Sequence, residues 1–190
     1  MTNGCLEAEN IFLKEAEAKE PKFERSGSCA VIILFVDNEC FVANIGDSRA
    51  IMSADQGKRL FLLTRDHRPT DEMERKRIET NGGKIYQSSA PAPAVEGEEP
   101  SIMYGPHRVV PGRLSVSRTI GDIEAKALKY GGNSGVVIAQ PEISQFTIKE
   151  DFHDFIVVGC DGIFDRLESQ AVLDIVWNTI NTNKHREMIL

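Results

Sequence analysis

The sequence predicts an α+β fold, because short apolar segments follow one another in runs and few helical patterns lie between them. Polar turns of a few residues join these segments, which favours antiparallel strands over a doubly wound parallel sheet. With 190 residues, of which 41% are hydrophobic, the chain is long enough for one domain with a real core.

The first part of the chain predicts one helix and four strands. Leu6, Ile11, Phe12 and Leu13 provide the apolar positions of a helix over residues 6–18. Apolar segments separated by turn residues then predict an antiparallel meander, with strands at residues 31–36, 40–43, 48–52 and 60–64.

After Pro69 the apolar period changes and predicts a helix. Asp71 and Glu74 resemble a capping box at its start, and Gly82-Gly83 ends it. Residues 88–101 contain almost no large apolar residue and predict a loop. Further strands are expected at residues 114–117, 136–139, 143–148 and 155–160, with helices at residues 122–129 and from Ser169 onward.

The composition of the chain indicates which class of binding partner and which cellular compartment to expect. A net charge of −7 argues against nucleic acid as the main partner, because phosphate backbones need basic patches. The four cysteines lack CxxC spacing and the start of the chain lacks a secretory pattern, so we expect an intracellular location, in the cytoplasm or the nucleus. No apolar run approaches the ~18–20 residues that a membrane span needs.

One apolar run ends in a pair of carboxylates. Residues 155–160 predict a strand buried on both faces, which stops at Asp161 and Gly162, and Asp165 follows four residues later. A carboxylate held at the end of a rigid strand suits a hard cation such as Mg²⁺ or Mn²⁺. A polar turn after a core strand explains this stretch equally well.

Three further aspartates stand in tight polar segments. They are Asp47 in Gly-Asp-Ser-Arg, Asp66 in Arg-Asp-His-Arg-Pro, and Asp122 after Ile-Gly. Each one alone is a common turn residue. Taken with Asp161 and Asp165, they look like oxygen ligands and turn anchors that converge from several strand ends.

Seven segments of the chain carry a resemblance to a known family. They lie, in order, at residues 26–30, 43–50, 63–69, 74–83, 114–122, 141–143 and 160–165, and include Asn-Ile-Gly-Asp-Ser-Arg-Ala and Cys-Asp-Gly-Ile-Phe-Asp. They closely resemble the metal-dependent protein serine/threonine phosphatases of type 2C, the PPM family. The resemblance covers nearly the whole chain from Ser26 to the last helix, and the departures are small, with Cys29 in place of Thr and Ser115 in place of Ala.

The resemblance implies a fold, an activity and a set of site residues. The fold would be two packed antiparallel sheets flanked by helices, an α-β-β-α sandwich. The activity would be hydrolysis of phosphoserine and phosphothreonine in proteins, with two Mg²⁺ or Mn²⁺ ions that lower the pKa of a bridging water. Asp161 matches a ligand of the binuclear centre. Asp161, Asp165 and Asp66 match a weaker third metal site.

The other implied roles concern turns and recognition. Asp47 and Asp122 would fix turns, with Arg–carboxylate pairs beside them. Residues 84–113 would form a variable flap linked to substrate choice. A haloacid-dehalogenase motif or a calcium loop is disfavoured, because the former needs Asp-x-Asp and the latter more acidic positions.

Three segments of the family's pattern are missing between residues 1 and 190. They are Arg-x-x-Met-Glu-Asp, Val-Phe-Asp-Gly-His-Gly-Gly and a late Asp-Asn, so no catalytic residue is assigned. We therefore expect residues 1–190 to form a partial catalytic domain, incomplete at both ends and inactive alone, within an enzyme that acts on phosphoproteins. The alternative is a catalytically incomplete pseudophosphatase that acts as a protein-binding module.

Overall fold

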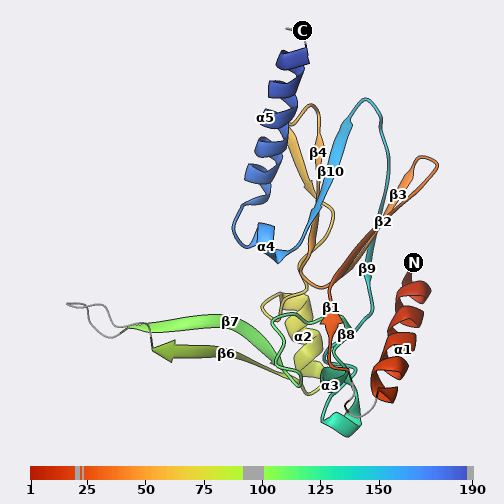
Figure 1. Cartoon of the computed structure of the whole chain (residues 1–190), viewed down its shortest axis with the longest axis vertical. Helices are drawn as coiled ribbons and strands as arrows, with labels where there is room; N and C mark the ends of the chain where they lie inside the picture. Colours follow the sequence, from red (N-terminus) through yellow and green to blue (C-terminus); the bar gives the residue numbers. More distant parts are fainter. Residues whose placement is uncertain (20–21, 23, 92–100, 188–190) are drawn as a thin grey trace. The chain divides into compact units, whose positions relative to one another are not determined.

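The computed structural model describes residues 1–19, 22, 24–91 and 101–187, and the chain forms two compact units (Figure 1). Unit 1 consists of Met1–Cys29 and His67–Gln140, and unit 2 of Ala30–Asp66 and Pro141–Leu190. Each unit is therefore built from two segments that are far apart in the sequence. Among the described residues, no helix has the length and apolarity needed to cross a membrane.

Unit 2 contains two antiparallel sheets of three strands each. The first has the order β2-β3-β9, with β2 at Ala30–Val36, β3 at Glu39–Ile45 and β9 at Glu142–Thr147. The second has the order β10-β4-β5, with β10 at His153–Gly159, β4 at Arg49–Ala54 and β5 at Arg59–Leu62. The central strands β3 and β4 are the most buried, because each is paired along both edges.

The two sheets of unit 2 pack face to face. Cys40 and Val42 of β3 and Ala50 of β4 form the buried centre of this contact. The opposite face of the β10-β4-β5 sheet is covered by α4 (Asp161–Phe164) and α5 (Ser169–Glu187), whose Phe164, Val172 and Leu173 pack on Ile51. The expected α+β sandwich is confirmed, with layers of helix, sheet and sheet in this unit.

Unit 1 is built from short elements around a smaller core. Its helices are α1 (Thr2–Ala18), α2 (Glu72–Thr80), α3 (Ile123–Lys126) and the 3₁₀ helix η1 (Leu128–Tyr130). Its strands are β1 (Gly27–Ser28) paired with β8 (Ile120–Gly121), and β6 (Lys84–Pro91) paired with β7 (Ile102–Val110). The core consists of Ile78, Val109, Ala125, Val136 and Val137.

The predicted meander is wrong at its middle turn. The pairs β2–β3 and β4–β5 form as expected, but β3 and β4 belong to different sheets. The chain passes from one sheet to the other just after β3, at Gly46, whose φ of 105° only glycine adopts easily. Stacking the two hairpins instead of placing them side by side lets both central strands bury both of their faces.

The predicted loop after α2 is wrong at its start, because residues 88–91 belong to a strand. Strands β6 and β7 form a hairpin whose pairing runs from Lys84↔Val110 to Pro91↔Ile102. The sequence pattern does not predict this pairing, because most of the hairpin buries no apolar face and its first strand contains small and polar residues such as Ser and Ala. Residues 92–100 of the predicted loop lie outside the described residues.

Two short apolar stretches do not form the predicted strands. Residues 114–117 and 136–139 contribute only single bridges, Val109↔Leu114 and Arg118↔Ile138. Their apolar residues pack into the core instead, where Val136 and Val137 are fully buried. The helix predicted at 122–129 is divided into α3 and η1, because Ala127 between them is extended.

The strand β10 differs from the prediction in its burial. Within the described residues it lies at the edge of its sheet, and Val158 is 48% exposed. The residues after it also differ, because Asp161 and Gly162 begin the helix α4 instead of forming a sharp turn. The two carboxylates are thus held by a helical turn.

Candidate functional site

The carboxylates of Asp161 and Asp165 lie at the two ends of α4. Asp161 is the first residue of this helix and Asp165 follows its last residue, with the Asp165 amide donating to the Asp161 carbonyl at 2.8 Å. Side chains four residues apart on a helical backbone are neighbours, and both of these are exposed. Their oxygens have the chemistry that a hard cation prefers.

Asp66 is held by an arginine from a neighbouring strand. Arg49 opens β4, and its Nε donates to Asp66 Oδ1 at 3.0 Å while its Nη2 donates to Asp66 Oδ2 at 2.8 Å. The two side chains are 22% and 17% exposed, so this two-pronged pair is mostly sheltered from water. The sequence predicted an Arg–carboxylate pair beside Asp47, and Arg49 forms such a pair with Asp66.

Asp47 lies in the turn between β3 and β4, and it is buried. The same turn is tied to the segment that carries Asp66, because Asn44 Nδ2 donates to the Gly46 carbonyl at 3.2 Å and to the Arg65 carbonyl at 2.8 Å. Two of the seven motif segments therefore meet in unit 2, and a structural role of Asp47 agrees with its place in the turn.

In unit 1, a buried glutamate joins two other motif segments. Glu74 is 1% exposed and accepts hydrogen bonds from Ser117 Oγ at 2.5 Å, Arg77 Nη2 at 2.6 Å and Arg118 Nη2 at 2.6 Å. Burial acts to raise the pKa of the Glu74 carboxyl, but the hydrogen bonds from Arg118, Ser117 and Arg77 outweigh it and lower this pKa to about 2. Glu74 is therefore ionised at neutral pH and holds both arginines.

The capping box predicted at the start of α2 is only half correct. The Asp71 side chain does accept from the amides of Met73 and Glu74, both at 3.1 Å, and is the N-cap. The Glu74 carboxylate, however, turns toward Ser117 and Arg118 instead of returning to the Asp71 amide.

Asp122 lies in the turn before α3. Its φ of 54° is left-handed, its amide donates to the Ser26 carbonyl at 2.9 Å, and a Cβ on Gly27 would overlap its carboxylate. Burial raises the pKa of the Asp122 carboxyl, and Lys126 opposes this effect. These contacts agree with the turn-fixing role that was expected for Asp122.

A buried ion pair lies beside Asp122 in unit 1. Lys126 Nζ donates to Glu9 Oε1 at 2.5 Å and to the Thr119 carbonyl at 2.7 Å, while Glu9 Oε2 accepts from the Gly121 amide at 2.7 Å. The side chains of Lys126 and Glu9 are 5% and 7% exposed. The pair links α1 to the β8–α3 segment. The local sequence pattern did not predict it.

The comparison with protein families decides the identity of the fold. A sequence model described as "Protein phosphatase 2C" matches residues 1–189. The chain belongs to the protein phosphatase 2C family. The resemblance drawn from the seven motif segments is thereby confirmed.

Relatives of this phosphatase 2C chain are much longer than 190 residues. "Probable protein phosphatase 2C 25" of Arabidopsis thaliana is 36% identical over 173 residues, which are 91% of this chain and 35% of the relative. "Protein phosphatase 1G" of Mus musculus is 34% identical over 174 residues, which are 91% of this chain and 28% of the relative. The chain thus spans about a third of the length of these curated relatives.

Solved structures support the fold of this phosphatase 2C chain. The serine-threonine phosphatase 2C from Toxoplasma gondii superposes with a TM-score of 0.69 at 19% identity, over 96% of this chain and 55% of that one. A C. elegans sex determining protein superposes with a TM-score of 0.65 at 24% identity, over 90% of this chain and 35% of that one.

Phosphatases of this family depend on Mg²⁺ or Mn²⁺, and the residues of unit 2 fit such an ion in part. Asp161 and Asp165 offer exposed carboxylate oxygens, whereas both oxygens of Asp66 accept from Arg49. Within the ranges that the structure describes, no group of three or more His, Cys, Asp or Glu side chains could hold a metal ion. Metal binding by these three aspartates stays a prediction.

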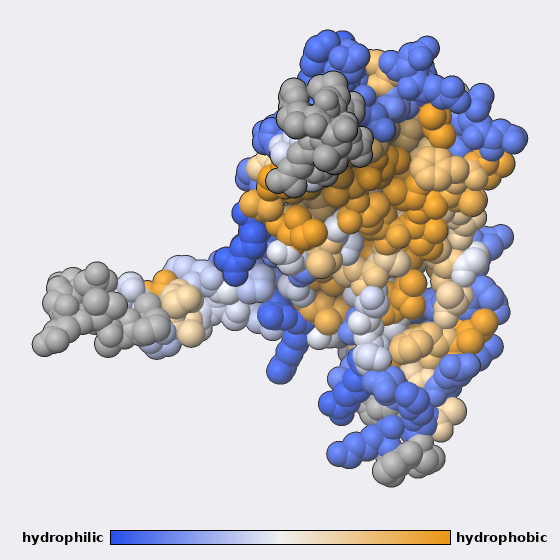
Figure 2. Space-filling view, turned by 45° about the horizontal axis from the view of Figure 1, so that its top comes forward, coloured by the Kyte–Doolittle hydropathy of each residue, from blue (hydrophilic) through white to orange (hydrophobic). Residues whose placement is uncertain are grey.

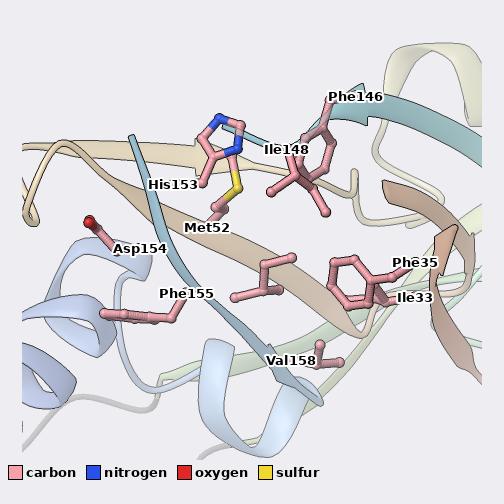
Figure 3. A pocket seen from close by; sticks show the side chains of 10 residues that line it. Ile33, Phe35, Met52, Phe146, Ile148, His153, Asp154, Phe155 and Val158 are labelled. Atoms are coloured by element: carbon pink, nitrogen blue, oxygen red, sulfur yellow. The ribbon is translucent and has the colours of Figure 1, made fainter. Parts of the chain in front are cut away.

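An apolar groove of about 400 Å³ opens in unit 2 of the phosphatase 2C chain. Figure 3 shows its lining, to which Ile33 and Phe35 of β2, Phe146 of β9 and Val158 of β10 contribute. Phe35 is 57% exposed. Figure 2 shows hydrophobic side chains gathered over a broad area of surface, and an apolar area of this kind usually marks a contact with another segment or protein.

Proposed function

We propose that this chain is part of a protein serine/threonine phosphatase that hydrolyses phosphoserine and phosphothreonine in proteins. The observation that carries the proposal is the match of the phosphatase 2C family over residues 1–189, in which all seven motif segments occur in order. The names of the relatives support it, since they too are described as protein phosphatases.

Asp161 and Asp165 are the residues that would bind the metal. A helical turn carries both exposed residues at the protein surface, where water and a phosphoryl group have access. Bound Mg²⁺ or Mn²⁺ would supply a hydroxide near neutral pH and neutralise charge on the phosphoryl oxygens. The chain's own part is to place two carboxylates on one helical turn.

We further propose that the 190 residues alone are a partial catalytic domain with little activity. Two exposed carboxylates are too few to hold two cations, because each ion needs well-placed protein ligands and a bridge needs a shared one. The groove lined by Phe35 and Val158 supports the same conclusion, since a complete domain rarely leaves such apolar side chains uncovered. Four free cysteines support the proposed location in the cytoplasm or nucleus.

The alternative is a pseudophosphatase that binds other proteins without chemistry. The described residues favour it in one respect, because they contain no metal-binding cluster of three acidic, His or Cys side chains. The exposed Ile102, Met103 and Tyr104 of the β6–β7 hairpin would then contribute a binding surface.

A phosphate-release assay separates these proposals. The purified 190-residue chain and the longest natural protein that contains it are each given a phosphothreonine peptide, with Mn²⁺ or with EDTA. We expect Mn²⁺-dependent release from the longer protein and little from the short chain. Robust release by the short chain would refute the partial domain, and no release by either protein would favour the binding module.

A further inference from the structure

Arg49 makes more contacts than an ordinary surface arginine. Besides its two hydrogen bonds to Asp66, its Nη1 donates to Ser169 Oγ at 3.1 Å, and its Cζ lies 4.9 Å from the centre of the Phe164 ring. One guanidinium group therefore joins the end of α4, the start of α5 and the segment after β5. A planar group with five donors in a fixed fork suits such a set of partners, whereas an ammonium group lacks this geometry.

The backbone of Arg49 is fixed at the same place. Arg49 pairs with Gly159 across the β4–β10 ladder, at the point where β10 ends and the chain enters α4. A Cβ on Gly159 would come within 2.9 Å of the Phe164 ring, so α4 folds back tightly on the end of its own strand. The arginine side chain also packs on this turn, because its guanidinium group lies over the Phe164 ring.

The contacts of Arg49 lie at both ends of the helical turn that carries the two candidate metal ligands. Phe164 and Ser169 stand on either side of Asp165, and α4 begins at Asp161. Phe164 is 7% exposed and packs in the core with Leu173, so its ring cannot move without the helical turn. The position of both carboxylates depends on this turn.

Asp66 is the anionic partner of Arg49, and we call this Arg49–Asp66 pair the clasp. Each of its oxygens accepts a charge-assisted hydrogen bond from Arg49, the arrangement that gives such pairs their strength and direction. A cation placed on Asp66 would have to displace the guanidinium group or lie against its positive charge. This conflicts with the role of Asp66 as a metal ligand that the resemblance implies.

We propose that Arg49 is a positioning residue that fixes α4 with its carboxylates Asp161 and Asp165, and that Asp66 holds Arg49 instead of binding a metal ion. The inference rests on the proposed function only where it takes Asp161 and Asp165 as metal-binding groups. Its prediction about α4 needs neither metal nor substrate.

Hydrogen–deuterium exchange of the 190-residue chain tests the clasp. The amides of Ile163, Asp165 and Leu167 donate within α4 and its C-terminal turn, so their exchange reports opening of this segment. We expect Arg49→Met and Asp66→Asn each to speed this exchange roughly tenfold or more, as the loss of a charge-assisted pair predicts.

Three further variants make the test specific. The double variant Arg49→Met/Asp66→Asn is expected to match Arg49→Met, because Asp66 acts on α4 only through Arg49. Arg49→Lys keeps the charge but not the two-pronged donor, so it should restore protection only in part. Arg65→Met is the control, since Arg65 pairs with Glu142 at 2.7 Å in the same unit and should leave α4 unchanged.

A titration with Mn²⁺ alone distinguishes the clasp from a metal site at Asp66. The clasp predicts that Arg49→Met and Asp66→Asn change Mn²⁺ affinity in the same direction. Tighter binding by Arg49→Met together with weaker binding by Asp66→Asn would overturn the proposal, as would unchanged exchange of α4 in Arg49→Met. An inactive longer protein would count against the proposed phosphatase and leave the exchange result standing.

Discussion

Replacing Glu74 with Gln should destabilise the protein strongly, and the loss should depend on pH. At neutral pH the carboxylate is 1% exposed and accepts from Ser117, Arg77 and Arg118, so the substitution leaves two partly buried guanidinium groups without their anion. Removing one partner of a buried ion pair costs about 3 kcal/mol or more. The pKa of Glu74, lowered from 4.5 to about 2, corresponds to a contribution of similar size, about 3 kcal/mol.

The sign of the pH dependence follows from the lowered pKa of Glu74. The stabilisation is fully present above pH 4.5 and is lost as the pH falls through the interval toward about 2. By pH 3 about 2 kcal/mol of it should be gone. Other carboxylates titrate in the same range, so the informative quantity is the difference in unfolding free energy between the wild type and Glu74→Gln.

Urea denaturation at pH 6 and pH 3, followed by circular dichroism, measures this difference. We expect a gap of about 3 kcal/mol at pH 6 that shrinks by about 2 kcal/mol at pH 3. Glu79→Gln is the matched control, because Glu79 is an exposed acid on the same helix. A gap that stays constant between the two pH values would show that the ionised Glu74 carboxylate does not provide this stabilisation.

Two further predictions concern unit 1. Asp71→Ala removes the N-cap of α2 and should lower the unfolding free energy by about 1 kcal/mol in urea, whereas an Asp71→Ser variant that lost as much would contradict a capping role. Lys126→Met leaves the buried Glu9 carboxylate unpaired and should cost about 3 kcal/mol. The double variant Glu9→Gln/Lys126→Met should lose less than the sum of the single losses in the same assay, and additive losses would argue against coupling.

The strand pairs of unit 2 are predictable from local sequence, but their sheets are not. Turn residues between apolar segments predict β2–β3 and β4–β5 correctly. Sheet membership depends on partners from the far end of the chain, through Asn44↔Glu142 for β3 and Arg49↔Gly159 for β4. No local period records these partners, so the meander was the natural but wrong prediction.

Long-range partners of individual side chains are hidden from local patterns for the same reason. Glu74 has the right spacing for a capping box, yet its carboxylate bonds Ser117 and Arg118, which lie 43 and 44 residues away. Asp161 and Asp165 could be found because they share one motif with a recognisable order of residues. The helical turn that presents them, and the Arg49 clasp around it, required the three-dimensional contacts.

The effect of Asp161→Asn, in the longest natural protein that contains this chain, tests whether Asp161 binds the metal ion. We expect Mn²⁺-dependent release of phosphate from a phosphothreonine peptide to fall to background, because the proposed metal ligand is lost while the protein stays folded. Asp174→Asn, a change on the exposed surface of α5, should leave the rate unchanged. An Asp161→Asn protein that keeps the rate and the Mn²⁺ requirement of the wild type would show that Asp161 is not a required metal ligand.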